Sequence, residues 1–269
     1  MSLQNAFLGS LVADAVSMPV HWYYNREALD KDYGDFHGYC KPHKNHPDSI
    51  LWRSQFSPIN HKADILGKQA KYWGQKGIHY HQFLDAGDNT LNLQLAAELY
   101  RDTIINGSFE KEKWLKRYSQ VMLTPEWHND TYAEEYHRAF FNNYAKGKQL
   151  QSCGISDYHI GGLSMIPALL ASMEAIDQND PSDQLENVLN LVRLTHDHEY
   201  TLRAATDLSR IFQRLINGES IRHTLTNLPL PGVSTRLLQK WETMKDREVV
   251  GEILSSACYL PESFVASLH

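Results

Sequence analysis

The strongest constraint on the fold is a succession of helix-length segments that fills most of the chain. Apolar residues in these segments recur at steps of three and four positions, which is the period of an amphipathic α-helix. Pro and Gly signals separate the segments at 124–125, 179–181, 217–218 and 229–232. The chain shows no alternation of strands with helices, no glycine-rich nucleotide fingerprint and no internal repeat. We therefore expect residues 1–269 to form one compact all-α domain of about ten or more helices.

The expected helices follow from these patterns, and 79–83 is expected to be a short strand or an extended lead into the next helix. Residues 26–60 are rich in Gly, Pro, His, Tyr and Asp, so we expect a long irregular excursion in which His37, His43 and His46 are solvated. Helices are expected at 1–16, 26–33, 61–73, 90–105, 109–122, 129–145, 165–176, 182–194, 199–216, 220–226, 234–244, 248–258 and 261–268.

Charge and cysteine content exclude several classes of partner. The net charge is -6 and no long run of Lys or Arg occurs, which argues against nucleic acid or an anionic membrane as the main partner. The 3 cysteines are widely spaced, so they suggest neither a disulfide framework nor a metal knuckle. No apolar run approaches the roughly 20 residues of a membrane helix. We expect a cytoplasmic protein.

A polar stretch leads into the helix expected at 90–105. Asp88, Asn89 and Thr90 bring a carboxylate, an amide and a hydroxyl together, and Gly87 allows a tight turn. Such oxygen donors suit Mg²⁺ or Ca²⁺, but Asp and Asn before a helix are also ordinary caps. Asp14 lies within an apolar helical stripe, where a carboxylate needs a polar partner. We therefore expect Asp14 to lie near Asp88.

Three further stretches carry candidate binding residues. Trp22 and Tyr23 suit either a core edge or stacking on a base or sugar. Gly161 and Gly162 precede an apolar helix, and their N–H groups could either hold a phosphate or form a plain connecting turn. His196 joins two helices and could bind a substrate or cap the second helix.

In order and spacing these motifs resemble the ADP-ribosylglycohydrolase family, which includes crystallin J1-like and dinitrogenase-reductase-activating enzymes. Residues 6–19 look like the family's opening helix, which usually ends in Gly-Asp-Ala-x-Gly-x-Pro. Residues 87–90 fall where the family has Thr-Asp-Asp-Thr, the first half of a binuclear Mg²⁺ site. Residues 161–167 resemble the loop and helix start that line the family's substrate cleft, and residues 194–196 resemble its helix-closing Thr-His.

The chain also departs from the family pattern. His21 stands where members commonly carry Glu, and Gly87 and Asn89 replace the first Thr and the second Asp of the metal motif. No equivalent of the family's acidic C-terminal metal-binding segment is recognisable after Leu228. A site built from Asp88, Asn89 and Thr90 offers few donors and a single negative charge. We expect weak Mg²⁺ binding and slow or absent hydrolysis by these 269 residues.

The resemblance implies hydrolysis of the glycosidic bond of an ADP-ribosylated protein or small molecule. In that reading a cation held by Asp88 and Asn89 positions ribose and water, and Asp88 or Asp14 stabilises the cationic sugar. The Gly161-Gly162 loop would hold phosphate, and Trp22 or Tyr23 would stack on the adenine. Two alternatives remain: a catalytically degenerate ADP-ribose-binding or crystallin-like structural protein, and an HD-type phosphohydrolase suggested by His196-Asp197.

Overall fold

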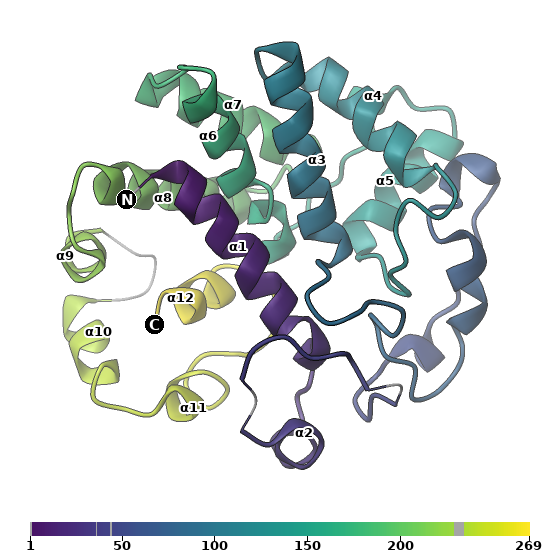
Figure 1. Ribbon diagram of the computed structural model, residues 1–269, viewed down its shortest axis with the longest axis horizontal. Coiled ribbons are helices and arrows are strands. Elements are labelled where there is room, and N and C mark those ends of the chain that lie inside the picture. The colour runs from purple at the N-terminus through teal and green to yellow at the C-terminus, as the bar shows by residue number, and fades with distance from the viewer. Residues whose placement is uncertain (1, 36, 44, 229–233) are drawn as a thin grey trace.

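The computed structural model describes residues 2–35, 37–43, 45–228 and 234–269, and in these residues the chain is all-helical (Figure 1). This confirms the all-α prediction; isolated β-bridges occur, but the described residues form no strand. The α-helices are α1 (Leu3–Ser17), α2 (Arg26–Tyr33), α3 (Leu91–Asn106), α4 (Lys111–Met122), α5 (Glu135–Ala145), α6 (Ile166–Ala175), α7 (Pro181–Arg193), α8 (Glu199–Ile216), α9 (Ile221–Thr226), α10 (Thr235–Trp241), α11 (Asp246–Val249) and α12 (Glu262–Leu268).

Short 3-10 helices fill several of the connections. They are η1 (Met18–Val20), η2 (Leu51–Arg53), η3 (His61–Ala63), η4 (Gly67–Tyr72), η5 (Leu150–Ser152) and η6 (Ile160–Leu163). In the described part of the chain, none of the helices combines the length and the apolar character needed to cross a bilayer.

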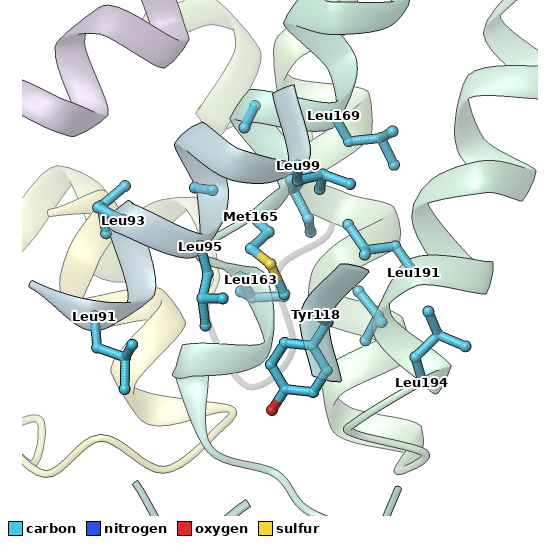
Figure 2. Close-up of a cluster of buried hydrophobic side chains, with 14 of the residues drawn as sticks. Leu91, Leu93, Leu95, Leu99, Tyr118, Leu163, Met165, Leu169, Leu191 and Leu194 are labelled. Carbon is cyan, nitrogen blue, oxygen red and sulfur yellow. The ribbon is translucent and has the colours of Figure 1, made fainter. Parts of the chain in front are cut away.

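Helix α6 is the centre of the core and packs against both α1 and α3. Figure 1 shows α1, in purple, running diagonally beside these two helices. Figure 2 shows leucines of α3, such as Leu95 and Leu99, turned toward Met165 and Leu169 at α6. Leu95, Leu99 and Leu169 are fully buried, and burial of each such side chain stabilises the fold by about 1.5–3 kcal/mol. This packing fixes the first turn of α3 beside the last turns of α1.

Capping residues explain where several helices begin and end. Ser2 caps α1 by accepting from Asn5 N–H, and Asp180 caps α7 just before Pro181. Helix α3 ends at Gly107, whose φ of 69° is the left-handed conformation of a C-terminal cap. At these helix ends, the local signals in the sequence are sufficient to predict where the helix begins or ends.

Four expected helices are wrong in extent. The helix expected at 234–244 ends at Trp241. The helix expected at 61–73 is two 3-10 turns, because Gly67 at φ 49° interrupts it. The helix expected at 248–258 ends at Val249, and Gly251 follows at φ 106°. The helix expected at 129–145 begins only at Glu135, because the preceding residues are held in another conformation by contacts such as Thr131 N–H to the Tyr80 carbonyl at 3.0 Å.

Residues 79–83 form turns rather than a strand, with only an isolated bridge just before them from Asn45 to Ile78. Position 1 of the first expected helix and the boundary signal at 229–232 lie outside the described residues. In the excursion 26–60, His37 and His43 are exposed as expected, but His46 is fully buried. The expectation of a solvated His46 is therefore wrong.

Candidate active site

A cavity of about 270 Å³ lies where the end of α1, the start of α3, the segment before α5 and η6 converge. A second cavity of about 190 Å³ adjoins it, and the two share Trp22, Glu134, His159 and Cys258 as lining residues. We call these two cavities together the cleft. Of the residues that the sequence marked as candidates, Asp14, Trp22, Thr90 and Gly161 line it. The combined space is of the size that small-molecule sites have.

Asp14 reaches from α1 to the first residues of α3. Its Oδ2 accepts from Thr90 N–H at 2.7 Å and from Asn89 Nδ2 at 3.0 Å, and its Oδ1 accepts from the Thr90 hydroxyl at 2.7 Å. Burial raises the pKa of Asp14, and the Thr90 and Asn89 hydrogen bonds oppose that rise. Asn89 and Thr90 are therefore the polar partners that the Asp14 carboxylate needs within its apolar helical stripe.

The Asp130 carboxylate, which is also distant from α3 in the sequence, caps the same helix start. Leu91 N–H donates to Asp130 Oδ2, while Thr90 N–H donates to Asp14. Thr90, the N-cap residue, makes no side-chain cap within its own helix. Two carboxylates at a helix N-terminus satisfy N–H groups that lack partners in the helix and face the positive end of its dipole. Asp14 and Asp130 thus provide the cap that Asp88 and Asn89 could have provided.

Asp88 points away from this arrangement. Its Oδ2 accepts from Asp85 N–H at 2.8 Å, and its side chain is exposed. It lines a separate, more open cavity of about 450 Å³ together with Asn89, Arg101 and Trp127. We call this the outer cavity. Asp14 contacts Asn89 and Thr90, the two residues after Asp88, whereas the Asp88 carboxylate bonds within its own turn. The expected closeness of Asp14 and Asp88 themselves stays a prediction.

The predicted donors do not fit a divalent-cation site. Asp88 binds its own turn, the Asn89 amide nitrogen is shared between Asp14 and the Leu11 carbonyl, and the Thr90 hydroxyl donates to Asp14. Mg²⁺ requires several oxygen donors that converge in near-octahedral geometry. Across the described residues, no group of three or more His, Cys, Asp or Glu side chains has metal-ligand geometry.

Glu134 is the most strongly perturbed carboxyl group in the cleft, and it lines both of its cavities. It precedes α5, is 8% exposed, and accepts from Asn92 Nδ2 at 2.9 Å. Burial raises its pKa to about 7, with the neighbouring Asp130 carboxylate adding to the rise. A carboxyl group with this pKa can donate or accept a proton near neutral pH.

A hydrogen-bonded network fixes the amide of Asn92 toward Glu134. Asn92 Oδ1 accepts from the Tyr136 hydroxyl at 2.8 Å and from His137 Nε2 at 3.0 Å. The Tyr118 hydroxyl donates to His137 Nδ1 at 2.6 Å, which leaves Nε2 as the protonated nitrogen of that ring. Because Asn92 Oδ1 is occupied by two donors, its NH₂ group faces the Glu134 carboxyl.

Histidines hold the segment that follows α1. His46 Nε2 donates to the His21 carbonyl at 2.8 Å, and His79 Nε2 donates to the Pro19 carbonyl at 3.0 Å. Both rings are fully buried. Burial lowers the pKa of His46 and lowers that of His79 to about 3, so both are neutral at physiological pH. The two rings therefore hold the backbone carbonyls of Pro19 and His21 in place, next to Trp22 in the wall of the cleft.

Trp22 and Tyr23 have separate roles despite their adjacency. Trp22 lines both cavities of the cleft and stacks on His81 with ring centroids 5.6 Å apart. Its φ of 60° is rare for a bulky residue and costs energy. Backbone strain of this kind is common at functional sites. Tyr23 lines neither cavity; its hydroxyl donates to Asp32 at 3.1 Å and its ring packs on His46. These contacts support Trp22, and not Tyr23, as a binding residue.

The glycines of η6 are needed for close packing. Gly161 N–H donates to His159 Nδ1 and Gly162 N–H to the His159 carbonyl, so neither is free for a phosphate in this conformation. A Cβ on Gly162 would lie 2.8 Å from the His196 ring. His196 is fully buried beneath it, against the Tyr136 ring, and burial lowers its pKa to about 3. It therefore supports the η6 wall of the cleft from behind.

The HD-type alternative gains no support from the geometry. His196 is fully buried whereas Asp197 is exposed, so the two side chains do not share a site. The His196 Nδ1 atom pairs with the Thr195 hydroxyl at 2.8 Å. A metal phosphohydrolase needs His and Asp ligands that converge on one ion.

Sequence reasoning missed Glu134, His81 and Asp130. Glu134 and Asp130 fell inside an expected helix, and His81 fell in a segment treated as a lead. The available signal was the mixture of three acidic residues with Tyr132 and Tyr136 at 130–136, because tyrosines of this kind favour a partly buried edge over a fully solvated helix start.

Comparison with known proteins places these observations in a family. The family model described as ADP-ribosylglycohydrolase matches residues 2–269. No curated protein matches the chain. The match covers α1, the start of α3, the segment before α5 and η6, which are the elements that build the cleft. The chain belongs to the ADP-ribosylglycohydrolase family.

Proposed function

We propose that the chain hydrolyses the glycosidic bond between the ribose of an ADP-ribosyl group and its acceptor, and that it does so in the cleft. The family acts on ADP-ribosylated substrates. The observation that carries the proposal is that two carboxyl groups, Asp14 and Glu134, line one cavity in different environments. Hydrolysis of glycosides commonly uses such a pair, one protonated and one ionised.

The two carboxyl groups take different roles because their partners differ. Asp14 receives three hydrogen bonds and faces the positive end of α3, which favours its ionised form. Glu134 accepts from the Asn92 side chain and is almost fully buried, and that burial raises its pKa. Glu134 is the general acid that protonates the leaving group, and Asp14 stabilises the cationic sugar that develops.

The smaller cavity of the cleft suits a flat group of the substrate. Trp22, Tyr80, Tyr132 and Tyr136 contribute aromatic surface to it, beside Glu134. Aromatic faces bind planar rings by stacking and edge contacts. The adenine or a planar acceptor group lies here while the ribose lies between the two carboxyl groups.

Members of this family are typically metal-dependent. The donors at 88–90 do not converge and do not fit such an ion, so the steps proposed for Asp14 and Glu134 do not involve a metal. The roles of Asp14 and Glu134 need only the hydrogen bonds described above.

The test is release of ADP-ribose from peptides that carry ADP-ribosylated arginine or serine. Replacing Glu134 by Gln keeps the shape and the bond from Asn92 but removes the proton donor, so turnover should fall by about 10²–10⁴-fold. Glu112→Gln, on the exposed face of α4, is the matched control and should turn over like the parent chain. Turnover that is equal in the Glu134→Gln and Glu112→Gln variants would refute the assignment.

A binding-only relative is the remaining alternative, favoured by the departures at His21, Gly87 and Asn89. That alternative predicts saturable binding of ADP-ribose with no release from either peptide. Binding isotherms measured on the same preparations separate the two functions.

A further inference from the structure

A hydrogen-bonded chain of four side chains runs through the wall of the cleft. His81 Nδ1 lies 2.6 Å from Asp130 Oδ1, and His81 Nε2 lies 3.0 Å from His21 Nδ1. His21 Nε2 lies 3.2 Å from the Ser17 hydroxyl, which donates to the Asp14 carbonyl at 3.3 Å. Both imidazole rings line the larger cavity, and His81 is only 3% exposed.

The hydrogen-bond partners along this chain indicate the charge of His81. The Asp130 carboxylate accepts, so His81 Nδ1 carries a proton. When the Ser17 hydroxyl donates to the Asp14 carbonyl, Ser17 accepts from His21 Nε2–H. A neutral His21 then presents a lone pair at Nδ1 and accepts from His81 Nε2–H. With this arrangement of donors both nitrogens of His81 are protonated, and the Asp130 carboxylate 2.6 Å away favours that imidazolium.

The surroundings of His81 favour that charge. Burial alone lowers the pKa of His81, but the carboxylates of Asp130, Asp14 and Glu134 raise it, and the net shift is upward. Burial and the nearby His81 lower the pKa of His21, which keeps that ring neutral. The titratable groups that act on His81 from the surrounding elements are Asp14, His21, His46, His79, Asp130 and Glu134.

The cleft has few other sources of positive charge. Among the described residues that line its two cavities there is no Lys or Arg, whereas Asp14, Glu134, Glu135 and Asp157 are acidic. An anionic ligand or a cluster of carboxylates in such a place needs a compensating cation. His81 lines the same cavity as Asp14 and Glu134, and its ring is covalently part of the chain, so it cannot leave the site as a metal ion can.

We propose that His81 is a fixed imidazolium that supplies the positive charge of the cleft, so that ligand binding there needs no divalent cation. The identification of this cleft as the binding site for ADP-ribosyl groups rests on the function proposed above. The charge of the imidazolium favours the ionised form of Asp14, and it acts without forming or breaking a bond. Asp130 is a positioning residue, because it lines neither cavity and acts on the ligand only through His81.

The first test reads the protonation of His81 directly and needs no turnover. Nitrogen NMR of the ¹⁵N-histidine-labelled chain, with His81 assigned by a His81→Gln variant, should show an imidazolium at pH 7. Asp130→Asn should lower the His81 pKa by about one unit or more, because an opposite charge is lost. His61→Gln, an exposed histidine in η3, is the control and should leave the His81 signal unchanged. A neutral His81 with one protonated nitrogen at pH 7 would overturn the proposal.

The second test measures the need for a metal. ADP-ribose binding should have the same Kd, within about twofold, in EDTA and in Mg²⁺, and Mg²⁺ alone should not raise the melting temperature in a saturable way. A saturable Mg²⁺ effect, or binding lost in EDTA, contradicts the proposal even if hydrolysis is observed. An imidazolium with metal-independent binding but no hydrolysis would contradict the proposed function and leave this inference standing.

Discussion

The cleft and the outer cavity flank the first turn of α3, and they differ in what surrounds their carboxyl groups. In the cleft, Asp14 and Glu134 are largely enclosed and hydrogen-bonded to fixed partners. In the outer cavity, Asp88 is exposed and bonds only within its own turn. A carboxyl group acquires a perturbed pKa by burial and by its neighbours, and not by its place in a motif.

The contrast shows how neighbouring residues of one motif can separate. Asp88 and Asn89 both line the outer cavity, but the Asn89 amide donates to Asp14, and Thr90 lines the cleft. The motif at 88–90 therefore contributes to the cleft mainly by holding Asp14. The predictions below test this division between the cleft and the outer cavity.

The largest expected effect on stability is pH-dependent and belongs to Glu134. Its folded-state pKa of about 7 exceeds the ordinary value of 4.5, so between these pH values the folded state keeps a proton that the unfolded state has lost. The free energy of unfolding therefore falls as the pH rises through this window, by about 3 kcal/mol in total. Urea unfolding at pH 5 and pH 8 measures this loss as the difference between the parent chain and Glu134→Gln, because the buried histidines titrate in both proteins.

Glu134→Gln should remove that pH dependence, because Gln does not ionise. Glu112→Gln should keep it, since Glu112 is exposed in α4. A slope that is the same in both variants would assign the pH dependence to other groups and contradict the perturbed pKa of Glu134.

Asp14→Asn should have the next largest effect. The substitution weakens the bonds from Thr90 N–H and Asn89 Nδ2, which now meet an amide in place of a carboxylate. We expect a loss of about 1–3 kcal/mol in the free energy of unfolding at pH 7. Denaturant unfolding measures it, and a neutral outcome would mean that Asp14 does not hold the start of α3.

Asp88→Asn should have the smallest effect. Its carboxylate makes one exposed hydrogen bond within a turn, so the cost should stay within about 0.5 kcal/mol. Release of ADP-ribose should continue at a rate close to that of the parent chain. If Asp88→Asn lost the release of ADP-ribose while its stability was unchanged, the catalytic site would have to be assigned to the outer cavity.

Local sequence signals predicted most of the fold. Helix α2 (Arg26–Tyr33) and helix α8 (Glu199–Ile216) have the bounds that caps and periodicity indicated. Errors arose where a tertiary contact or a glycine overrides the period, as at Gly67, and where Asp130 is drawn to the start of α3. Propensity describes a segment alone, whereas these residues respond to partners that are distant in sequence.

The site was only partly predictable for the same reason. Asp14 stood out because a carboxylate in an apolar stripe needs a partner, and Thr90 supplies it. Nothing local distinguishes Glu134 from its exposed neighbour Glu135, because their difference is created by the fold, which buries Glu134 and brings Asn92 to it. His81 acquires its role only when the fold brings Asp130 beside it.

Hydrogen exchange measured with and without ADP-ribose tests most directly which cavity binds the ligand. We predict added protection at residues 158–164 and 257–260, which border the cleft, and no change at 85–88 and 127–129, which border the outer cavity. Protection confined to the outer-cavity segments would contradict the assignment of Asp14 and Glu134 as the groups that act on the substrate.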